Sequence, residues 1–170
     1  MASETTGTGC PVGNYIGTYL NDHLAGATVG RELSKRALGE NEGTPLGTFL
    51  EKLHREIVED RQTLLEVMDA LDVGEDHVKT VAALVGERIG RLKPNGNLLS
   101  YSPLSRVVEL EGLAVGVHAK GSLWRALGLL DDPRLEPFDF AALDRRAQRQ
   151  RKGLEEHRLD SARIAFEASD

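Results

Sequence analysis

The sequence predicts an all-α protein, an antiparallel four-helix bundle with an additional short helix between the second and third long helices. Apolar residues recur at intervals of three and four residues in five segments, and no segment shows the sustained alternation of a strand. Four of these segments reach about 25 residues, or roughly 40 Å of helix at the rise of about 1.5 Å per residue. Helices of such similar length favour packing along their whole length.

The first long helix is expected over residues 13–38. Its apolar stripe contains Ile16, Leu20, His23, Ala27, Gly30 and Ala37. Gly39 and Pro45 end it, because glycine releases a helix and proline cannot continue one. Thr44 followed by Pro45 is typical of a helix start, and the second helix is expected to run to about Leu71. Its predicted inward residues are Leu50, Leu53, Ile57, Leu64, Met68 and Leu71.

The short helix is expected over residues 75–91, and its apolar side contains Val78, Val81, Ala82, Val85 and Ile89. Ser102 followed by Pro103 repeats the start signal, and the third long helix is expected to extend to about Leu130. Its predicted inward residues are Leu104, Val107, Val108, Val115 and Trp124. After a turn with two prolines, the fourth long helix is expected over 138–167. Its predicted inward residues are Phe140, Leu143, Ala147, Leu154, Ile164 and Phe166.

Length and composition favour one domain over residues 13–168, preceded by a flexible tail at 1–12. The formal net charge of −6 opposes a general affinity for nucleic acid or anionic membranes, since both require a basic surface. No apolar run approaches the roughly 18 residues that span a bilayer. The first residues also lack the apolar core of a secretory signal. We therefore expect a cytoplasmic protein that binds neither nucleic acid nor membranes.

Four long helices with an extended connection between the second and the third resemble the ferritin-like superfamily. The segments NYIGTYLNDHLAGATVGREL and YSPLSRVVELEGLAVGVHAKGSLWRAL also resemble an uncharacterised group of bacterial proteins of this build. The resemblance covers most of residues 13–130. It implies a ferritin-like layout in a bacterial protein, and the group brings no established activity.

Di-iron proteins of ferritin-like build take a Glu from each of two helices and a Glu-x-x-His motif from each of the other two. This chain has one such motif, from Glu51 to His54, near the start of the second helix. The di-iron motif is therefore not intact, which opposes an oxidase or an iron store.

Each long helix nevertheless carries one histidine. When the helices are threaded up, down, down and up, His23 and His118 fall at about the same height, and Glu111 shares a stripe with His118. Together with Asp22 they could form a site for a divalent metal such as zinc, which imidazole and carboxylate ligands suit. In the alternative, these residues lie at the edges of apolar stripes and pair with arginines such as Arg61 or Arg125. The sequence itself requires no cofactor.

The stretch RIGRLKPNGNLLSYSPLSR at 88–106 carries four positive charges and no negative charge. Arg91, Lys93 and Arg106 are expected to come together near the start of the third long helix, an end that attracts anions. This arrangement predicts an anion or phosphate-ligand site. The alternative is a plain connector between two helices.

Several glycines fall inside the predicted helices, where each costs about 1 kcal/mol relative to alanine. They include Gly26, Gly30, Gly112, Gly116 and Gly121. Close approach of two helices, with the first pair facing Gly112 and Gly116, is the simplest explanation. Space for a ligand between the helices is the alternative.

The chain has no nucleophile motif and no phosphate-binding glycine loop. We therefore expect a non-enzymatic helical bundle that acts by self-association, as a homo-oligomer, or by binding a partner or a small ligand. A divergent metal-binding protein and an anion binder that uses residues 88–106 are the alternatives. No motif identifies the ligand, the partner or the oligomeric state.

Overall fold

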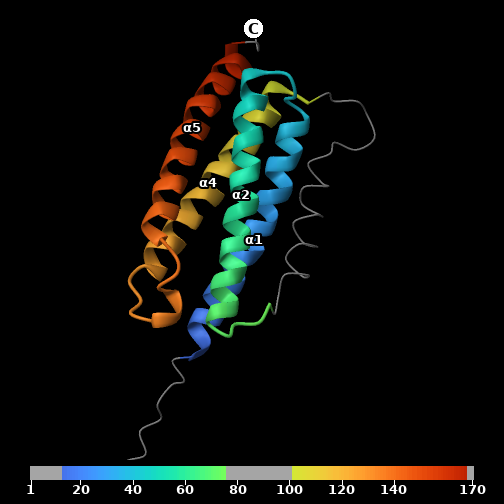
Figure 1. Cartoon of the computed structure of the whole chain (residues 1–170). Helices are drawn as coiled ribbons and strands as arrows, with labels where there is room; N and C mark the ends of the chain where they lie inside the picture. Colours follow the sequence, from blue (N-terminus) through green and yellow to red (C-terminus); the bar gives the residue numbers. More distant parts are fainter. Residues whose placement is uncertain (1–12, 76–100, 168–170) are drawn as a thin grey trace, which may run out of the picture.

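The structure, a computed structural model, describes residues 13–75 and 101–167 (Figure 1). Within these ranges it contains helices and no strand, so the predicted all-α class is confirmed. The elements are α1 (Gly13–Gly39), α2 (Pro45–Ala70), α4 (Pro103–Leu127), the 3-10 helix η1 (Pro133–Leu135) and α5 (Phe140–Glu167). The predicted tail at 1–12 and most of the predicted helix at 75–91 lie outside the described residues.

Both predicted starts with a cap and a proline are confirmed. The Thr44 hydroxyl accepts a hydrogen bond from the Gly47 backbone N–H at 3.0 Å, and Pro45 takes the first position of α2. The Ser102 hydroxyl accepts one from the Ser105 backbone N–H at 3.1 Å at the start of α4. Each cap satisfies a backbone N–H that has no partner inside the helix, and this fixes where the helix begins.

The four long helices lie side by side, as Figure 1 shows. α1 and α2 run in opposite directions and are joined by a short turn, and α4 and α5 form a second such pair through η1. α2 and α4 point the same way, so the end of α2 and the start of α4 lie at opposite ends of the bundle. No helix of the described residues is both long and apolar enough to span a bilayer.

The core consists of two apolar clusters. One cluster, which includes residues of η1, contains Leu20, Leu24, Leu64, Val67, Met68, Leu123, Trp124, Leu127, Leu135 and Phe140. The other, which includes the residues beside the turn between α1 and α2, contains Ala37, Leu46, Leu50, Leu53, Ile57, Leu110, Leu113, Val117, Ala147 and Leu154. Most of the predicted inward residues of α2 belong to these clusters.

The predicted inward stripe of α4 is wrong in part. Val107 and Trp124 are buried, but Leu104, Val108 and Val115 are 56%, 46% and 71% exposed. α4 carries two apolar stripes about 100° apart, because neighbouring residues in a helix differ by that angle. The stripe that packs inward runs through Val107, Leu110, Leu113, Val117 and Trp124. At the end of α5, the predicted inward residues Ile164 and Phe166 are likewise exposed.

Candidate ligand cavity

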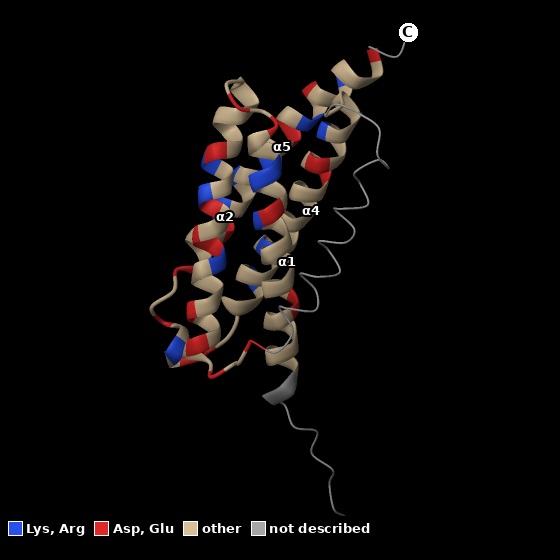
Figure 2. Ribbon diagram, turned by 90° about the vertical axis from the view of Figure 1, so that its right-hand side faces the viewer, with Lys and Arg blue, Asp and Glu red and all other residues tan. Residues whose placement is uncertain are grey.

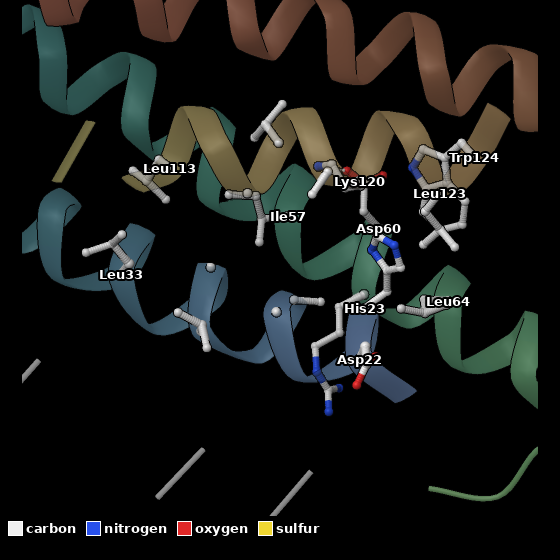
Figure 3. Close-up of a pocket in the computed structure, with 18 of the residues that line it drawn as sticks. Asp22, His23, Leu33, Ile57, Asp60, Leu64, Leu113, Lys120, Leu123 and Trp124 are labelled. Carbon is white, nitrogen blue, oxygen red and sulfur yellow. Dashed lines mark hydrogen bonds and ion pairs between the residues drawn. The ribbon is translucent and has the colours of Figure 1, made fainter. Parts of the chain in front are cut away.

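A cavity of about 420 Å³ lies between α1, α2 and α4 (Figure 3). This volume falls within the range of about 300–1,000 Å³ that is usual for small-molecule sites. The exposed small residues of its lining, Gly26, Gly112, Gly116 and Ala119, belong to α1 and α4. The cavity therefore opens between these two helices.

The helix glycines border this open space. A methyl group added at Gly26, Gly30 or Gly116 would meet no atom of the described residues within 4 Å. At Gly112 it would meet only the Leu33 Cδ2 atom, at 3.1 Å. Close approach of α1 and α4, the simplest explanation from the sequence, therefore fits Gly112, whereas space between the helices fits Gly26, Gly30 and Gly116.

Gly121 differs from the glycines of the cavity. A methyl group there would lie 3.1 Å from the Asp144 carboxylate and 3.4 Å from the Ala147 Cβ atom. Close approach of α4 to α5 explains this glycine. The bundle thus uses glycine for tight packing on one side of α4 and for open space on the other.

The lining changes from apolar to polar along the cavity. Leu33, Ile57 and Leu113 lie toward one end, as Figure 3 shows. The other end brings together the side chains that can form hydrogen bonds or ion pairs. They are Tyr19, Asp22, His23, Asp60, Arg61, Lys120 and Trp124, and the apolar Leu64 and Leu123 lie among them. The cavity is therefore amphipathic along its length.

A buried charge cluster forms one wall of the polar end. Asp60, 2% exposed, accepts hydrogen bonds from Lys120 Nζ and from the Arg146 guanidinium. Lys120 also donates to Gln150 Oε1 at 2.7 Å, and the Gln150 amide donates to Glu56 Oε2 at 2.8 Å. Burial lowers the pKa of Lys120, and the negative charge of Asp60 opposes this change. The cluster joins α2, α4 and α5.

Acidic and basic residues are interspersed along α2 (Figure 2). The charge cluster is the place where this charged helix meets the core. Asp60 is compensated there by two cations, so it is not available as a free carboxylate to a ligand in the cavity.

Trp124 is 1% exposed and lines the polar end. Its ring stacks on Phe140 at a centroid distance of 6.2 Å. Its indole Nε1–H has no hydrogen-bond partner among the described residues. A buried donor without an acceptor is unfavourable, and the large majority of such groups in proteins are paired.

His23 is half-buried at the same end, and its ring stands edge-on to Tyr19 at a centroid distance of 4.6 Å. Burial lowers the pKa of His23, and the neighbouring Asp22 carboxylate opposes this change. The neutral imidazole is therefore the form that the fold favours.

Arg61 is also half-buried and lines the cavity from α2. Its Nε atom donates to the Thr28 hydroxyl at 3.4 Å. No carboxylate of the described residues lies within ion-pair distance of its guanidinium. Arg61 is thus a cation of the cavity lining without an acidic partner among residues 13–75 and 101–167.

The structure does not bring the four residues of the predicted metal site together. Asp22 and His23 line the cavity, whereas Glu111 pairs with Arg158 at 3.2 Å and His118 Nδ1 lies 3.4 Å from Arg151. Within the described ranges, no group of three or more His, Cys, Asp or Glu residues could hold a metal ion.

The physical reason is the choice between the two stripes of α4. Glu111 and His118 belong to the exposed stripe, which also carries Val115 and points away from the cavity. Pairing with arginines was the alternative interpretation of these residues. The arginines belong to α5, however, and are not the predicted Arg61 and Arg125.

Of the predicted anion site, only Arg106 lies within the described residues, so the convergence with Arg91 and Lys93 stays a prediction. The Arg106 guanidinium lies over the Tyr101 ring, 5.6 Å from its centroid. Its Nε atom is buried and has no hydrogen-bond partner in the part of the chain that the structure describes. Arg106 thus packs against the residue that precedes the cap of α4.

Tyr101 belongs to a second buried polar cluster. Its hydroxyl donates to Glu109 Oε2 at 2.9 Å and accepts from the Asn41 amide at 3.0 Å. Arg36 Nε lies 3.0 Å from the other Glu109 oxygen, as an ion pair without hydrogen-bond geometry. Burial raises the pKa of Glu109, and the hydrogen bond from Tyr101 and the positive charge of Arg36 oppose this change. Burial also raises the pKa of Tyr101, to about 12. The cluster ties the start of α4 to the end of α1.

Sequence reasoning missed Asp60 and Lys120 as parts of the site and assigned Trp124 to core packing alone. The sequence contained a signal for both residues, because each charged side chain stands in a helical row of inward apolar residues. Asp60 continues the row of Ile57 and Leu64, and Lys120 lies at the same spacing before Trp124. A charge at an inward position of a helix has to be compensated from another helix.

Comparisons of the chain with models of known protein families, with curated proteins and with solved structures find no match. The function is therefore inferred from the residues of the site alone.

Proposed function

We propose that this protein binds a small, largely apolar ligand in the cavity between α1, α2 and α4, and that it acts as a binding protein and not as an enzyme. The observation that carries the proposal is the set of three helix glycines, Gly26, Gly30 and Gly116, that face open space. Each costs about 1 kcal/mol of helix stability relative to alanine. Close packing does not offset this cost, so the space itself is the feature that the glycines provide.

The layout supports a bundle of ferritin-like type without its metal chemistry. α2 and α4 run in the same direction, as a long connection between the second and third helices of such a bundle requires. The carboxylate of Asp60, which reaches the middle of the bundle, is held by Lys120 and Arg146. Two cations around one carboxylate oppose a divalent metal at the same place.

Trp124 offers a direct test, because it is the only tryptophan of the chain and it lines the cavity. Titration with decanol, a neutral and mainly apolar probe, should change the Trp124 fluorescence in a saturable way. The variant Gly116→Leu fills the cavity and should weaken decanol binding at least about tenfold, or about 1.4 kcal/mol.

Gly39→Leu is the matched control, since Gly39 lies outside the cavity lining and a methyl group there also meets nothing within 4 Å. It should bind decanol as the wild type does. The proposal would be refuted by the absence of a saturable response, or by unchanged affinity in Gly116→Leu when circular dichroism shows that the variant is folded.

A further inference from the structure

We infer that the ligand is an amphiphile with a carboxylate head group at the end of the cavity that Arg61, His23 and Trp124 line, and an apolar tail that extends toward Leu33 and Leu113. The inference rests on the proposed function and specifies the chemistry of the ligand. It follows from the donors at one end of the cavity, from their charge balance, and from the composition and size of the other end.

The polar end offers hydrogen-bond donors that the described residues leave partly or wholly without acceptors. The Trp124 indole N–H is buried and has no partner among the described residues, and Arg61 has a single long hydrogen bond, to Thr28. The imidazole ring of His23 adds at least one further N–H. An ionised carboxylate only accepts hydrogen bonds, has about four acceptor positions, and matches the guanidinium fork.

The charge balance favours an anion over a cation. Of the acidic residues that line this end, Asp60 is already paired with Lys120 and Arg146, and Asp22 is exposed to solvent. Among the described residues, Arg61 has no acidic partner. A ligand anion would pair with Arg61, whereas a ligand cation would be repelled by Arg61 and would find only the solvent-exposed carboxylate of Asp22.

At the opposite end Leu33, Ile57 and Leu113 are apolar, as Figure 3 shows, and glycines with open space beside them line the cavity as well. A head group placed there would be desolvated without compensation, so the tail occupies this end. At about 30 Å³ for a water-sized group, the cavity of about 420 Å³ holds roughly fourteen methylene-sized groups. A carboxylate of the size of decanoate therefore fits.

The test compares probes with the same tail and different heads. Wild-type protein is titrated at pH 8 with decanoate, decanol and decylammonium, and Trp124 fluorescence is followed. Decanoate should bind at least about tenfold more tightly than either of the others. Arg61→Gln should abolish this preference, because decanoate loses far more affinity than decanol, and Arg61→Lys, which keeps the charge, should retain part of it.

Arg31→Gln is the control for a general loss of positive charge on this side of the bundle. Arg31 pairs with Glu32, is only partly buried and does not line the cavity. This variant should keep the wild-type preference for decanoate.

The outcomes separate the inference from the proposed function. Equal affinity for the three probes, or a preference for decylammonium, would overturn the carboxylate assignment and leave a general apolar site. A preference that survives in Arg61→Gln would overturn the role of Arg61. Binding of none of the probes would overturn both proposals.

Discussion

Replacement of Gly26 and Gly116 by alanine should stabilise the fold and weaken ligand binding at the same time. Alanine is favoured over glycine in a helix by about 0.8–1 kcal/mol. At both positions the added methyl group meets no atom of the described residues within 4 Å, so no clash reduces this gain. The double variant should therefore gain about 2 kcal/mol in the free energy of unfolding. For a chain of this size that gain corresponds to a rise in Tm of about 4–8 °C.

The assay is urea denaturation followed by far-ultraviolet circular dichroism, with the slope m compared between variants. An unchanged m with a higher midpoint indicates a change in stability alone. Gly47→Ala is the opposing control, because its methyl group would lie 2.1 Å from the Asn41 carbonyl oxygen and should destabilise the protein. Destabilisation by the double variant would show that the space beside α1 and α4 is filled, and it would contradict the cavity.

Three further predictions concern the buried polar groups. Asp60→Asn should cost about 3–5 kcal/mol in the free energy of unfolding, because Lys120 stays buried without its counter-charge. Adding Lys120→Met to this variant should recover much of the lost stability in the same urea assay. Tyr101→Phe should cost about 1–3 kcal/mol, since Glu109 loses a buried donor, and equal midpoints in thermal denaturation would contradict this. Because the folded pKa of His23 lies below 6.5, the unfolded chain binds more protons below that pH, so stability falls as pH drops through this window. His23→Gln should reduce that slope between about pH 7 and pH 5, and identical slopes would exclude His23 as its source.

The start of each capped helix could be predicted from the sequence because the chemistry is local. A hydroxyl followed by proline at Thr44–Pro45 and Ser102–Pro103 specifies a helix start within a few residues, whatever the rest of the chain does. The all-α class followed from apolar periodicity, which is equally local. Neither requires knowledge of which helix packs on which.

The choice of inward stripe on α4 could not be predicted, because it depends on partners that are distant in the sequence. The Leu104 and Val108 stripe and the Val107 and Leu110 stripe have similar spacing and similar composition. Contact with α1 and α5 buries the second stripe. The prediction of the metal site failed for the same reason, because Glu111 lies on the exposed stripe of α4 and not on the buried one.

The two buried polar clusters hold the helices unequally, and this difference accounts for the place of the cavity. The cluster around Asp60 joins α2, α4 and α5 through Lys120 and Arg146, and it contains no residue of α1. α1 is joined to α4 elsewhere, by the ion pair between Arg36 near the end of α1 and Glu109 near the start of α4. On the facing surfaces of α1 and α4, Gly26, Gly30 and Gly116 have no side chains that could fill the space between the helices. Buried ion pairs fix the arrangement of helices more than they add to stability, so the charge cluster can hold three helices in place while the fourth leaves room for a ligand.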